Sequence, residues 1–319
     1  MSDNLGMKRI LLIGTGPMAI SYTEVLKAMN KSFTVIGRGI NSAKEFEEKT
    51  GIKPITGGLT IFLKENKVES NSLAIIAVGT EQLMTTLLSL IDSGITNILI
   101  EKPAAISIEE LLENEASLTP FSKSIFVAYN RRFYSSVIEA QRLIEEDGGL
   151  KTMHFEFTEW AHKIEPLNKA FGVKENWFFA NSTHVIDLAF FIGGKPKEWQ
   201  AYSKSGSLNW HKKTNFVGAG ITEKEVLFSY LSNWESAGRW GIELLTDKRR
   251  IYLRPLEGIG IQLKGTIPIV EHPFDDALDR KFKPGLFKQV EAFLNKDKAR
   301  LIDCYEQIRL SKDIYRKML

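Results

Sequence analysis

A glycine-rich turn near the start of this 319-residue chain has a spacing suited to binding an anion. Residues Ile10 to Ala19 read Ile-Leu-Leu-Ile-Gly-Thr-Gly-Pro-Met-Ala, so an apolar strand runs into a tight turn and then into a helix. The free N–H groups and the positive dipole end of that helix would face a bound anion. The pattern therefore predicts a site for the pyrophosphate of a dinucleotide.

The residues of this turn have separate roles. Gly14 permits the tight turn, and Gly16 lets the backbone approach a phosphate without a Cβ in the way. Pro17 suits the first helical position, where a missing N–H has no effect. We expect the cofactor to contact a run of five residues, Gly14, Thr15, Gly16, Pro17 and Met18.

The end of the next strand, where residues 35–39 read Val-Ile-Gly-Arg-Gly, bears on which dinucleotide binds. An NAD site usually has Asp or Glu about 20 residues beyond the glycines, where the carboxylate bonds the ribose hydroxyl. That acid is absent, and Arg38 lies where a guanidinium could bind a 2′-phosphate, with Ser42 adding a hydroxyl. The alternative is a solvated arginine in a turn. We predict NADP as the favoured cofactor, with NAD possible.

Two further motifs have residues suited to acid–base chemistry. Glu101-Lys102-Pro103 follows the apolar strand Asn97 to Ile100. Ligands of doubly wound sheets bind beyond the carboxyl ends of strands, so Lys102 is expected in the cofactor crevice, where it can bond a substrate hydroxyl. The proline keeps Lys102 out of helical geometry. The alternative is an ordinary surface lysine.

The second motif is Asn181-Ser-Thr-His184-Val-Ile-Asp187. His184 and Asp187 are three residues apart, hence neighbours on one helical face, where the carboxylate would orient the imidazole. An imidazole that titrates near neutrality suits the proton released or consumed when an alcohol and a ketone interconvert. The alternative is a core histidine, because the helix that follows is strongly apolar.

The segment Tyr129 to Tyr134 contains two adjacent arginines, Arg131 and Arg132, at the end of an expected strand. They could meet an anionic cofactor or substrate, or they could form a solvated joint between domains. Both interpretations remain open.

The elements that must position these residues change character near residue 130. Before it, apolar strands alternate with amphipathic helices, which predicts a doubly wound parallel sheet. The expected strands are 7–13, 33–37, 73–79, 97–101 and 124–129, and the expected helices are 17–29, 41–50, 81–93 and 107–116. Ser107 and Glu110 form a capping box for the last of these helices.

Beyond residue 130, alternating patterns predict an α+β domain with an open, mostly antiparallel sheet. Its expected strands are 152–160, 197–204, 225–233, 240–246 and 249–254. An apolar helix is expected at 182–192, and two amphipathic helices at 286–319, broken near 295–300. We therefore predict an α/β chain with a Rossmann domain over 1–130 and a substrate-binding and oligomerisation domain over 131–319.

Composition limits the remaining possibilities. A net charge of +3 is too small to indicate nucleic acid or a membrane surface as partner. No apolar stretch approaches the ~20 residues that span a bilayer. The polar segment Met1 to Lys8 precedes only four apolar residues, unlike a signal peptide. A single cysteine, Cys304, is typical of a reducing cytoplasm, where we expect the protein, and one cysteine with five scattered histidines indicates no metal site.

Taken in order, these motifs resemble those of the Gfo/Idh/MocA family, the relatives of glucose–fructose oxidoreductase and inositol dehydrogenase. The resemblance rests on residues 14–19, on 101–103, on 129–133, and on His184 to Asp187 ahead of Gly193-Gly194. It covers essentially the whole chain.

The resemblance implies a nicotinamide-dependent oxidoreductase that acts on a hydroxyl or keto carbon of a sugar, cyclitol or sugar nucleotide. It implies catalytic roles for Lys102 and His184 and cofactor contacts from Glu101 and Lys102 and from the turn at Gly79 and Thr80. It also implies a homodimer or homotetramer formed through the open sheet. Substrate contacts are expected from four residues, Asn130, Arg131, Asn181 and Asp187.

The sequence departs from the family pattern at two places. Relatives that are dehydrogenases commonly have Asp four residues before the histidine, where this chain has Ala180. The turn at residues 79–82 also lacks a proline that relatives often have. Two alternative functions therefore remain open: a reductase of the same fold for a non-sugar substrate, such as an imine or a tetrapyrrole, and an NADP-sensing regulatory protein without catalysis.

Overall fold

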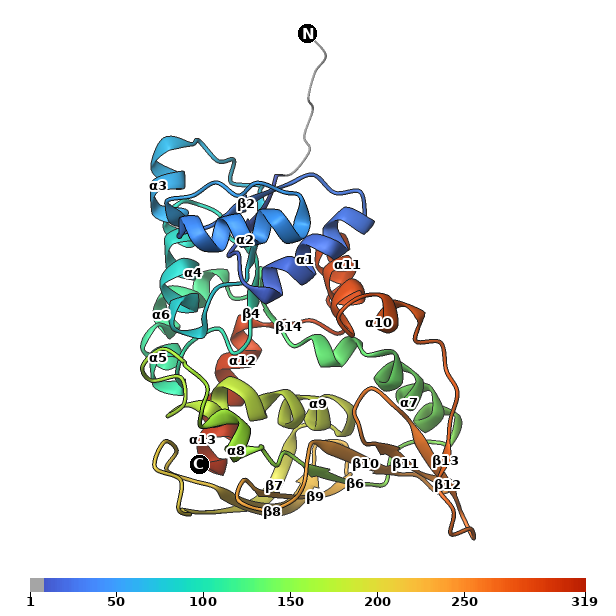
Figure 1. Cartoon of the computed structure of the whole chain (residues 1–319). Coiled ribbons are helices and arrows are strands. Elements are labelled where there is room, and N and C mark those ends of the chain that lie inside the picture. Colours follow the sequence, from blue (N-terminus) through green and yellow to red (C-terminus); the bar gives the residue numbers. More distant parts are fainter. Residues whose placement is uncertain (1–8) are drawn as a thin grey trace. The chain divides into compact units, whose positions relative to one another are not determined.

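A computed structural model describes residues 9–319, and the described chain forms two units (Figure 1). The first unit comprises the chain up to Ala128 together with Leu286–Ile308, and the second comprises Tyr129–Gly285 and Arg309–Leu319.

The first unit alternates strands and helices as the sequence predicts. The expected strand at 7–13 begins outside the described residues, and the cap of Ser107 is confirmed, because its Oγ accepts the Glu110 N–H at 3.0 Å. The elements are β1 (Ile10–Ile13), α1 (Pro17–Ala28), β2 (Phe33–Ile36), α2 (Ile40–Thr50), α3 (Gly58–Glu65), β3 (Leu73–Ile76), α4 (Leu83–Asp92), β4 (Asn97–Glu101), α5 (Ile108–Glu113), α6 (Glu115–Leu118), β5 (Ile125–Ala128), α11 (Leu286–Asn295), β14 (Ile302–Asp303) and α12 (Cys304–Leu310).

The strands of this unit form one sheet in the order β14-β5-β4-β3-β1-β2. Every pair from β2 to β5 is parallel, and the strands are buried throughout or nearly so, as a sheet covered on both faces requires. Helices α1, α2 and α11 pack together on one face, and α3 packs against α4 on the other (Figure 1). A single parallel bridge between Ile36 and Ile55 stands where a further edge strand would lie.

The strand order reverses between β1 and β3. The chain passes from β1 to β2 on one side and returns to β3 on the other, so a crevice opens beyond the carboxyl ends of β1 and β3. Such a switch point is where open α/β sheets bind ligands. The fold therefore places the glycine turn after β1 at the position where a cofactor is expected.

The segment Leu286–Ile308 belongs to the first unit, whereas the sequence assigns it to a second domain over 131–319. Strand β14 pairs antiparallel with β5, with Ile302 opposite Val127, and α11 packs on α1. This return of the chain was not predicted because β14 has only two residues and too short an apolar pattern to be read as a strand.

The second unit contains a large sheet and the helices that follow or precede it. Its elements are η3 (Asn130–Phe133), α7 (Ser135–Glu146), β6 (Thr152–Glu156), α8 (Ala161–Ile164), η4 (Phe178–Ser182), α9 (Thr183–Gly193), β7 (Pro196–Lys204), β8 (Asn215–Thr222), β9 (Leu227–Asn233), β10 (Gly241–Leu245), β11 (Arg249–Leu253), β12 (Gly260–Leu263), β13 (Val270–Glu271), α10 (Ala277–Lys281), η5 (Ser311–Tyr315) and α13 (Arg316–Met318).

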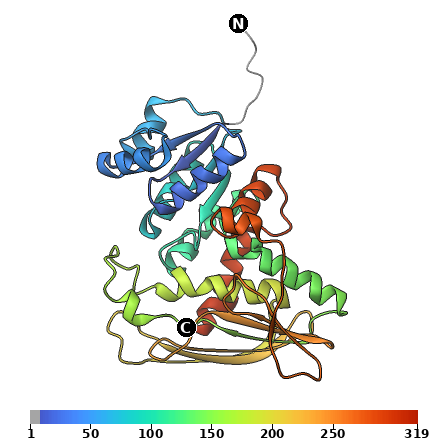
Figure 2. The same ribbon diagram turned by 45° about the vertical axis from the view of Figure 1, so that its right-hand side comes forward.

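The eight strands have the order β13-β12-β11-β10-β6-β9-β8-β7. Strands β6 and β9 are parallel, and the other neighbouring pairs are antiparallel, so the expected open, mostly antiparallel sheet is confirmed. Helix α9 lies on one face of the sheet (Figure 2), where Phe190 meets Phe155 of β6 edge to face at 5.4 Å. Strand β8 was not predicted, since Gly218 and Gly220 interrupt its pattern; a Cβ on Gly218 would collide with the Tyr230 ring.

Candidate functional site

The glycine turn after β1 has the backbone that the sequence predicts. Gly14 has φ +122°, and a Cβ there would collide with the carbonyl oxygen of Ala77, at the end of β3. A Cβ on Gly16 would meet no atom within 4 Å, so the backbone at Gly16 borders open space. The turn therefore packs tightly against β3 at its first glycine and leaves room at its second.

Helix α1 begins directly after this turn, and no side chain caps it. Gly16 is the N-cap residue, Pro17 is in the first helical turn, and the Ile20 N–H bonds the Gly16 carbonyl. The N–H groups of Met18 and Ala19 precede the first intrahelical donor and have no helical partner. An uncapped helix start next to open space is suited to a phosphate.

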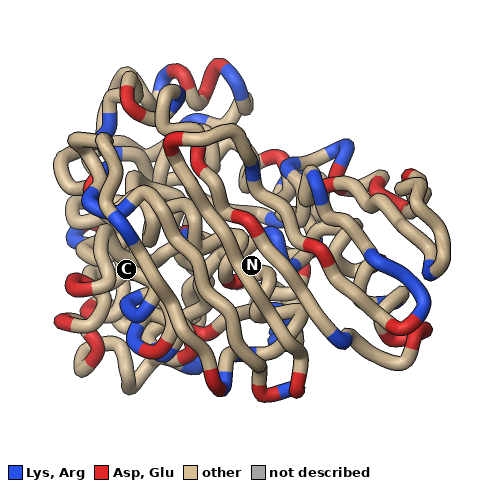
Figure 3. The backbone as a smooth tube through the Cα atoms, turned by 90° about the horizontal axis from the view of Figure 1, so that it is seen from below, with Lys and Arg blue, Asp and Glu red and all other residues tan. Residues whose placement is uncertain are grey.

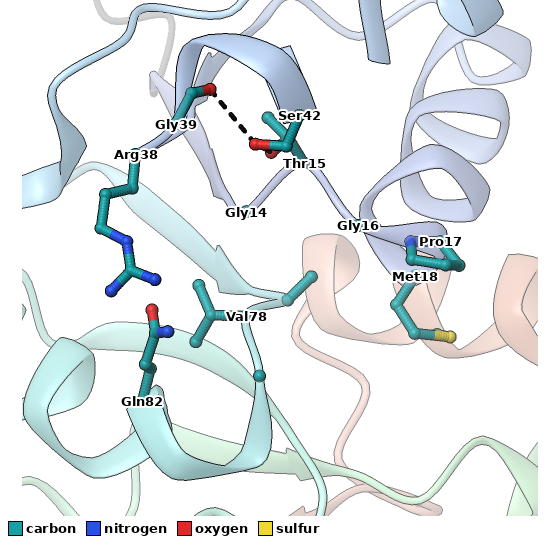
Figure 4. Close-up of a pocket in the computed structure, with 12 residues that line it drawn as sticks. Gly14, Thr15, Gly16, Pro17, Met18, Arg38, Gly39, Ser42, Val78 and Gln82 are labelled. Carbon is teal, nitrogen blue, oxygen red and sulfur yellow. Dashed lines mark hydrogen bonds between the residues drawn. The ribbon is translucent and has the colours of Figure 1, made fainter. Parts of the chain in front are cut away.

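A cavity of about 550 Å³ occupies the switch point (Figure 4). It is lined by the glycine turn and by residues that follow β2 and β3, namely Gly14, Thr15, Gly16, Pro17, Met18, Arg38, Gly39, Ser42, Ala77, Val78, Gly79 and Gln82. The structure thus brings together eight of the residues predicted to bind the cofactor. Thr80, predicted with Gly79, lies in the following 3₁₀ turn and outside this lining.

A second cavity of about 230 Å³ shares Gly14, Arg38, Val78 and Gln82 with the first. Val78 and Gln82 were not predicted, although their position just after an apolar strand was a usable signal. Among the described residues, neither cavity is lined by Asp or Glu. Both are therefore without the carboxylate that would bond a ribose diol.

Arg38 lies at the junction of the two cavities. Its side chain is exposed, and Figure 4 shows its guanidinium directed toward the Gln82 amide. On the opposite wall, the Ser42 hydroxyl donates to the Gly39 carbonyl at 3.2 Å and accepts from Thr15 Oγ1 at 3.2 Å. The Arg38 guanidinium gives the cavity a cation, which suits an anionic oxygen cluster, while the Thr15 and Ser42 hydroxyl protons are donated within the protein.

The motif at the end of β4 is held by side chains of its own unit. The Glu101 carboxylate accepts from the buried Tyr22 hydroxyl at 2.8 Å, and burial together with Glu101 raises the pKa of Tyr22. The Lys102–Pro103 peptide is cis, and the Pro103 carbonyl accepts from buried Gln307 of α12 at 3.1 Å. Tyr22 and Gln307 therefore fix the chain on both sides of Lys102, a support that the sequence did not indicate.

His184 lies on α9 in the second unit, within an aromatic setting. It is 6% exposed, and its ring meets the ring of Tyr129 edge to face at 5.9 Å and lies 5.9 Å from the ring of Trp240. A π-helical turn, η4, leads directly into α9 and so sets the position of His184.

Asp187 has a partner that the sequence did not indicate. Both of its carboxylate oxygens accept from Arg132, at 2.9 Å from Nε and 2.6 Å from Nη2, and both side chains are buried. The predicted orienting role toward His184 was argued from helical spacing alone. The fold also brings η3 against α9 and gives this carboxylate a bidentate guanidinium partner, and the orienting role toward His184 stays a prediction. The predicted role of Asp187 in substrate binding stays a prediction.

Asn181 contacts a carboxylate that sequence reasoning missed. Its Nδ2 donates to both oxygens of Glu159 at 3.0 Å, and the Ser182 hydroxyl donates to Glu159 Oε1 at 2.8 Å. Glu159 is 1% exposed, and burial raises the pKa of its carboxyl. Ala180 is buried beside these residues on η4. A buried carboxyl therefore reaches this turn from the segment after β6, which no pattern in the sequence marks.

Asn130 and Arg131 lie on η3, directly after the first unit ends. Asn130 is buried and its Nδ2 donates to the Pro284 carbonyl at 2.9 Å. The Arg131 guanidinium stacks over Trp240, with its carbon 4.7 Å from the ring centroid. Lys102 and His184, the two predicted catalytic residues, belong to different units.

Within residues 9–319, no cluster of three or more His, Cys, Asp or Glu side chains is arranged to hold a metal ion. In the same residues, no helix is long and apolar enough to cross a membrane.

No family model matches the chain, and no curated protein sequence matches it. Solved structures do match it over nearly its whole length. An oxidoreductase of Thermotoga maritima superposes with a TM-score of 0.74 at 16% identity, over 98% of this chain and 97% of that one. Levoglucosan dehydrogenase in complex with NADH superposes with a TM-score of 0.73 at 16% identity, over 98% and 96% of the two chains.

A third structure is the WlbA dehydrogenase of Chromobacterium violaceum, in complex with NADH and UDP-GlcNAcA. It superposes with a TM-score of 0.69 at 17% identity, over 100% of this chain and 94% of that one. The chain has the fold of these dehydrogenases. The predicted combination of a Rossmann unit and a second unit with an open sheet is thereby confirmed.

Proposed function

We propose that the chain is an NADP-dependent oxidoreductase that acts on a hydroxyl or keto carbon of a carbohydrate-type substrate. The observation on which the proposal depends is the cavity at the switch point, lined by the glycine turn and by Arg38. Dehydrogenases of the same fold, solved with NADH, with UDP-GlcNAcA or named for levoglucosan, support a nicotinamide cofactor and a sugar or sugar-nucleotide substrate.

The preference for NADP is supported by the charge of the cavity walls. A 2′-phosphate needs a cation and hydrogen-bond donors, and the Arg38 guanidinium offers both. The Ser42 hydroxyl, which donates to the Gly39 carbonyl, would have to turn to donate to the phosphate. A carboxylate at this place would repel that phosphate, and neither cavity lining has one within the described chain. NAD remains a second substrate for the same cavity.

A bound nicotinamide supplies the hydride donor or acceptor for interconversion of an alcohol and a ketone. Lys102 Nζ donates a hydrogen bond to the reacting substrate oxygen and holds it in place. The His184 imidazole accepts or returns the proton of that oxygen. Asn130, Arg131 and Asn181 are the proposed substrate contacts.

Cofactor preference is tested by Arg38→Asp, with NADPH and NADH binding measured by fluorescence titration. Loss of charge-assisted bonds to a phosphate corresponds to roughly 10- to 100-fold in affinity, and NADH binding should be retained or improved. Lys44→Asp is the matched control, because it makes the same charge change on α2 at an exposed residue outside the cavity lining. An unchanged ratio of the two affinities would refute the role of Arg38.

Catalysis is tested by Lys102→Ala. We expect turnover to fall far more than NADPH affinity, because Lys102 is assigned to the reacting oxygen. Lys64→Ala, an exposed position on α3, serves as the control. Undiminished turnover in Lys102→Ala contradicts the assignment.

A sensor that binds NADP without turnover is the second candidate, and Ala180 favours it, since family dehydrogenases commonly have a carboxylate there. Incubation with NADPH and a panel of keto-sugars separates the two. Loss of absorbance at the reduced nicotinamide band identifies an enzyme. Tight NADPH binding without turnover on any member identifies a sensor.

We also propose that two copies associate through the open sheet. On its outer face, neighbouring strands present Tyr202, Val217 and Leu231 side by side, with 67%, 48% and 52% exposed. Figure 3 shows long uncharged stretches along these strands. An apolar row of this kind is typical of a homodimer interface. Sedimentation should show a dimer that Val217→Asp dissociates, and a monomeric wild type contradicts the proposal.

A further inference from the structure

Two adjacent arginines of η3 have very different surroundings. The Arg132 guanidinium is bound on two nitrogens by Asp187. The Arg131 guanidinium forms no ion pair with any Asp or Glu of the described chain, and its Nε, shielded from solvent, has no hydrogen-bond partner there. Arg131 as a residue is half-buried, and a guanidinium nitrogen shielded from water is costly unless an anion or hydrogen-bond acceptor satisfies it. The Arg131 guanidinium could therefore still bind an anionic group of a ligand.

Arg131 is held in this position by aromatic rings. Its guanidinium carbon lies 4.7 Å from the Trp240 ring centroid and 5.8 Å from that of Tyr134. Burial lowers the pKa of the Arg131 guanidinium, and the nearby Tyr134, Glu257 and Glu159 act in the opposite direction. The stacking fixes the plane of the guanidinium and leaves its N–H groups at the edge, where they can donate to a ligand.

A second guanidinium contacts the same indole. The Arg239 guanidinium carbon lies 4.6 Å from the Trp240 ring and 4.7 Å from the Trp160 ring, and the Arg239 side chain is 43% exposed. The His184 ring is 5.9 Å from the same Trp240 ring. Two guanidiniums and the proposed acid–base imidazole thus surround one tryptophan within a single unit.

The nearby acids do not complete this site. Arg239 Nη1 forms a long ion pair with Glu159 Oε2 at 3.7 Å. The Glu159 oxygens also accept from Asn181 and Ser182, and burial disfavours the charged form of Glu159 by raising its pKa. Glu257, which also acts on Arg131, is an exposed residue. The arginines around Trp240 therefore keep positive charge that can bind an anionic ligand.

We propose that Arg131 and Arg239, arranged on Trp240, form a subsite for an anionic group of the substrate, so that the protein prefers acidic sugars over neutral ones. The chemistry recognised is a cluster of anionic oxygens, either a carboxylate or a phosphate, because both accept two parallel N–H bonds from a guanidinium. The inference rests on the proposed function, in which His184 acts on the sugar. It adds that the anionic group of the substrate binds near Trp240, whose ring also lies 5.9 Å from the His184 ring.

The test compares sugars that differ only in the anionic group. Affinities of D-glucuronate, D-glucose 6-phosphate and D-glucose are measured by calorimetry on the full chain saturated with NADPH. We expect at least one anionic sugar to bind roughly 10- to 100-fold more tightly than glucose. Whichever anionic sugar binds better distinguishes a carboxylate subsite from a phosphate subsite. Equal affinities for all three sugars, or binding of none, overturn the proposal.

Substitutions test whether Arg131 and Arg239 cause the preference for anionic sugars. Arg131→Gln should abolish the preference for the anionic sugar, and Arg239→Gln, whose side chain is 43% exposed in the wild type, should reduce it. Arg142→Gln removes an exposed arginine of α7 and should change nothing. A preference that survives in both Arg131→Gln and Arg239→Gln contradicts the subsite. Anion preference without any NADPH oxidation on keto-sugars would leave the subsite standing and reject the proposed catalysis instead.

Discussion

The buried pair of Arg132 and Asp187 predicts a large loss of stability when one partner is removed. Its two hydrogen bonds are 2.9 and 2.6 Å long, and the side chains are 6% and 1% exposed. Asp187→Asn keeps the shape of the side chain but removes the negative charge that pairs with the buried Arg132 guanidinium. Breaking a buried pair in this way costs about 3–5 kcal/mol. For a unit of this size, that corresponds to a melting temperature roughly 6–20 °C lower.

The measurement is thermal and urea unfolding of wild type and variant, followed by near-ultraviolet circular dichroism. Lys197→Gln is the control, because it removes an exposed ion pair with Glu225 and should cost less than about 1 kcal/mol. The double variant Arg132→Met/Asp187→Leu should recover most of the loss, since two apolar side chains leave no buried charge. If Asp187→Asn costs no more than Lys197→Gln, the pair is not the anchor between η3 and α9 that we infer.

Three further predictions concern single titratable groups. The hydrogen bonds from Arg142 and His272 lower the pKa of Glu139 to about 2, so the stability that its carboxylate contributes is present above pH 4.5 and is lost as the pH falls toward 2. Glu139→Gln should therefore reduce the pH dependence of the free energy of unfolding between pH 4.5 and 2. An unchanged pH dependence contradicts this prediction. Burial raises the pKa of Glu159, so ionisation of its carboxyl opposes folding above pH 4.5. In urea titrations, the free energy of unfolding of Glu159→Gln minus that of wild type should rise with pH from 4.5 upward. If this difference falls instead, the folded protein favours the charged form of Glu159. Burial, reinforced by the neighbouring carboxylate, raises the pKa of Cys304 to about 12; a disulfide reagent at pH 8 should label it only after unfolding, and rapid labelling of the native protein would show that the thiol is accessible.

The cofactor half of the candidate site was predictable from sequence because its determinants are local. A glycine with φ +122° is required where the turn crosses β3, and the residues after each apolar strand must meet at the carboxyl edge of a parallel sheet. Position along the chain therefore sufficed to assign the cavity residues from Gly14 to Arg38. Gln82 and Val78 follow from the same rule applied to β3.

The second unit was predictable in outline only, because its key contacts join segments far apart in the chain. Glu159 meets Asn181 and Ser182 across more than 20 residues, and Arg132 meets Asp187 across 55. Helical spacing predicts His184 as a neighbour of Asp187, but spacing along one helix carries no information about which other element packs on it, so the Arg132 partner was not predicted. The same limit hid the return of the chain through β14.

The adjacent residues Arg131 and Arg132 show that neighbours in the sequence can have different surroundings in the fold. In the sequence they are two equivalent cations at the end of a strand. The sequence does not say which of them contacts an anionic ligand and which lies at a joint between domains. In the fold, the Arg132 guanidinium binds a buried carboxylate and the Arg131 guanidinium stacks on an indole. Arg132 therefore has an anionic partner, and Arg131 forms no ion pair within the described chain. An anion subsite is thus inferred from a missing partner, and a missing partner is visible only when the surroundings of both residues are known. The chemistry of the second unit therefore depends on which charges the fold leaves unpaired, rather than on which charged residues the sequence contains.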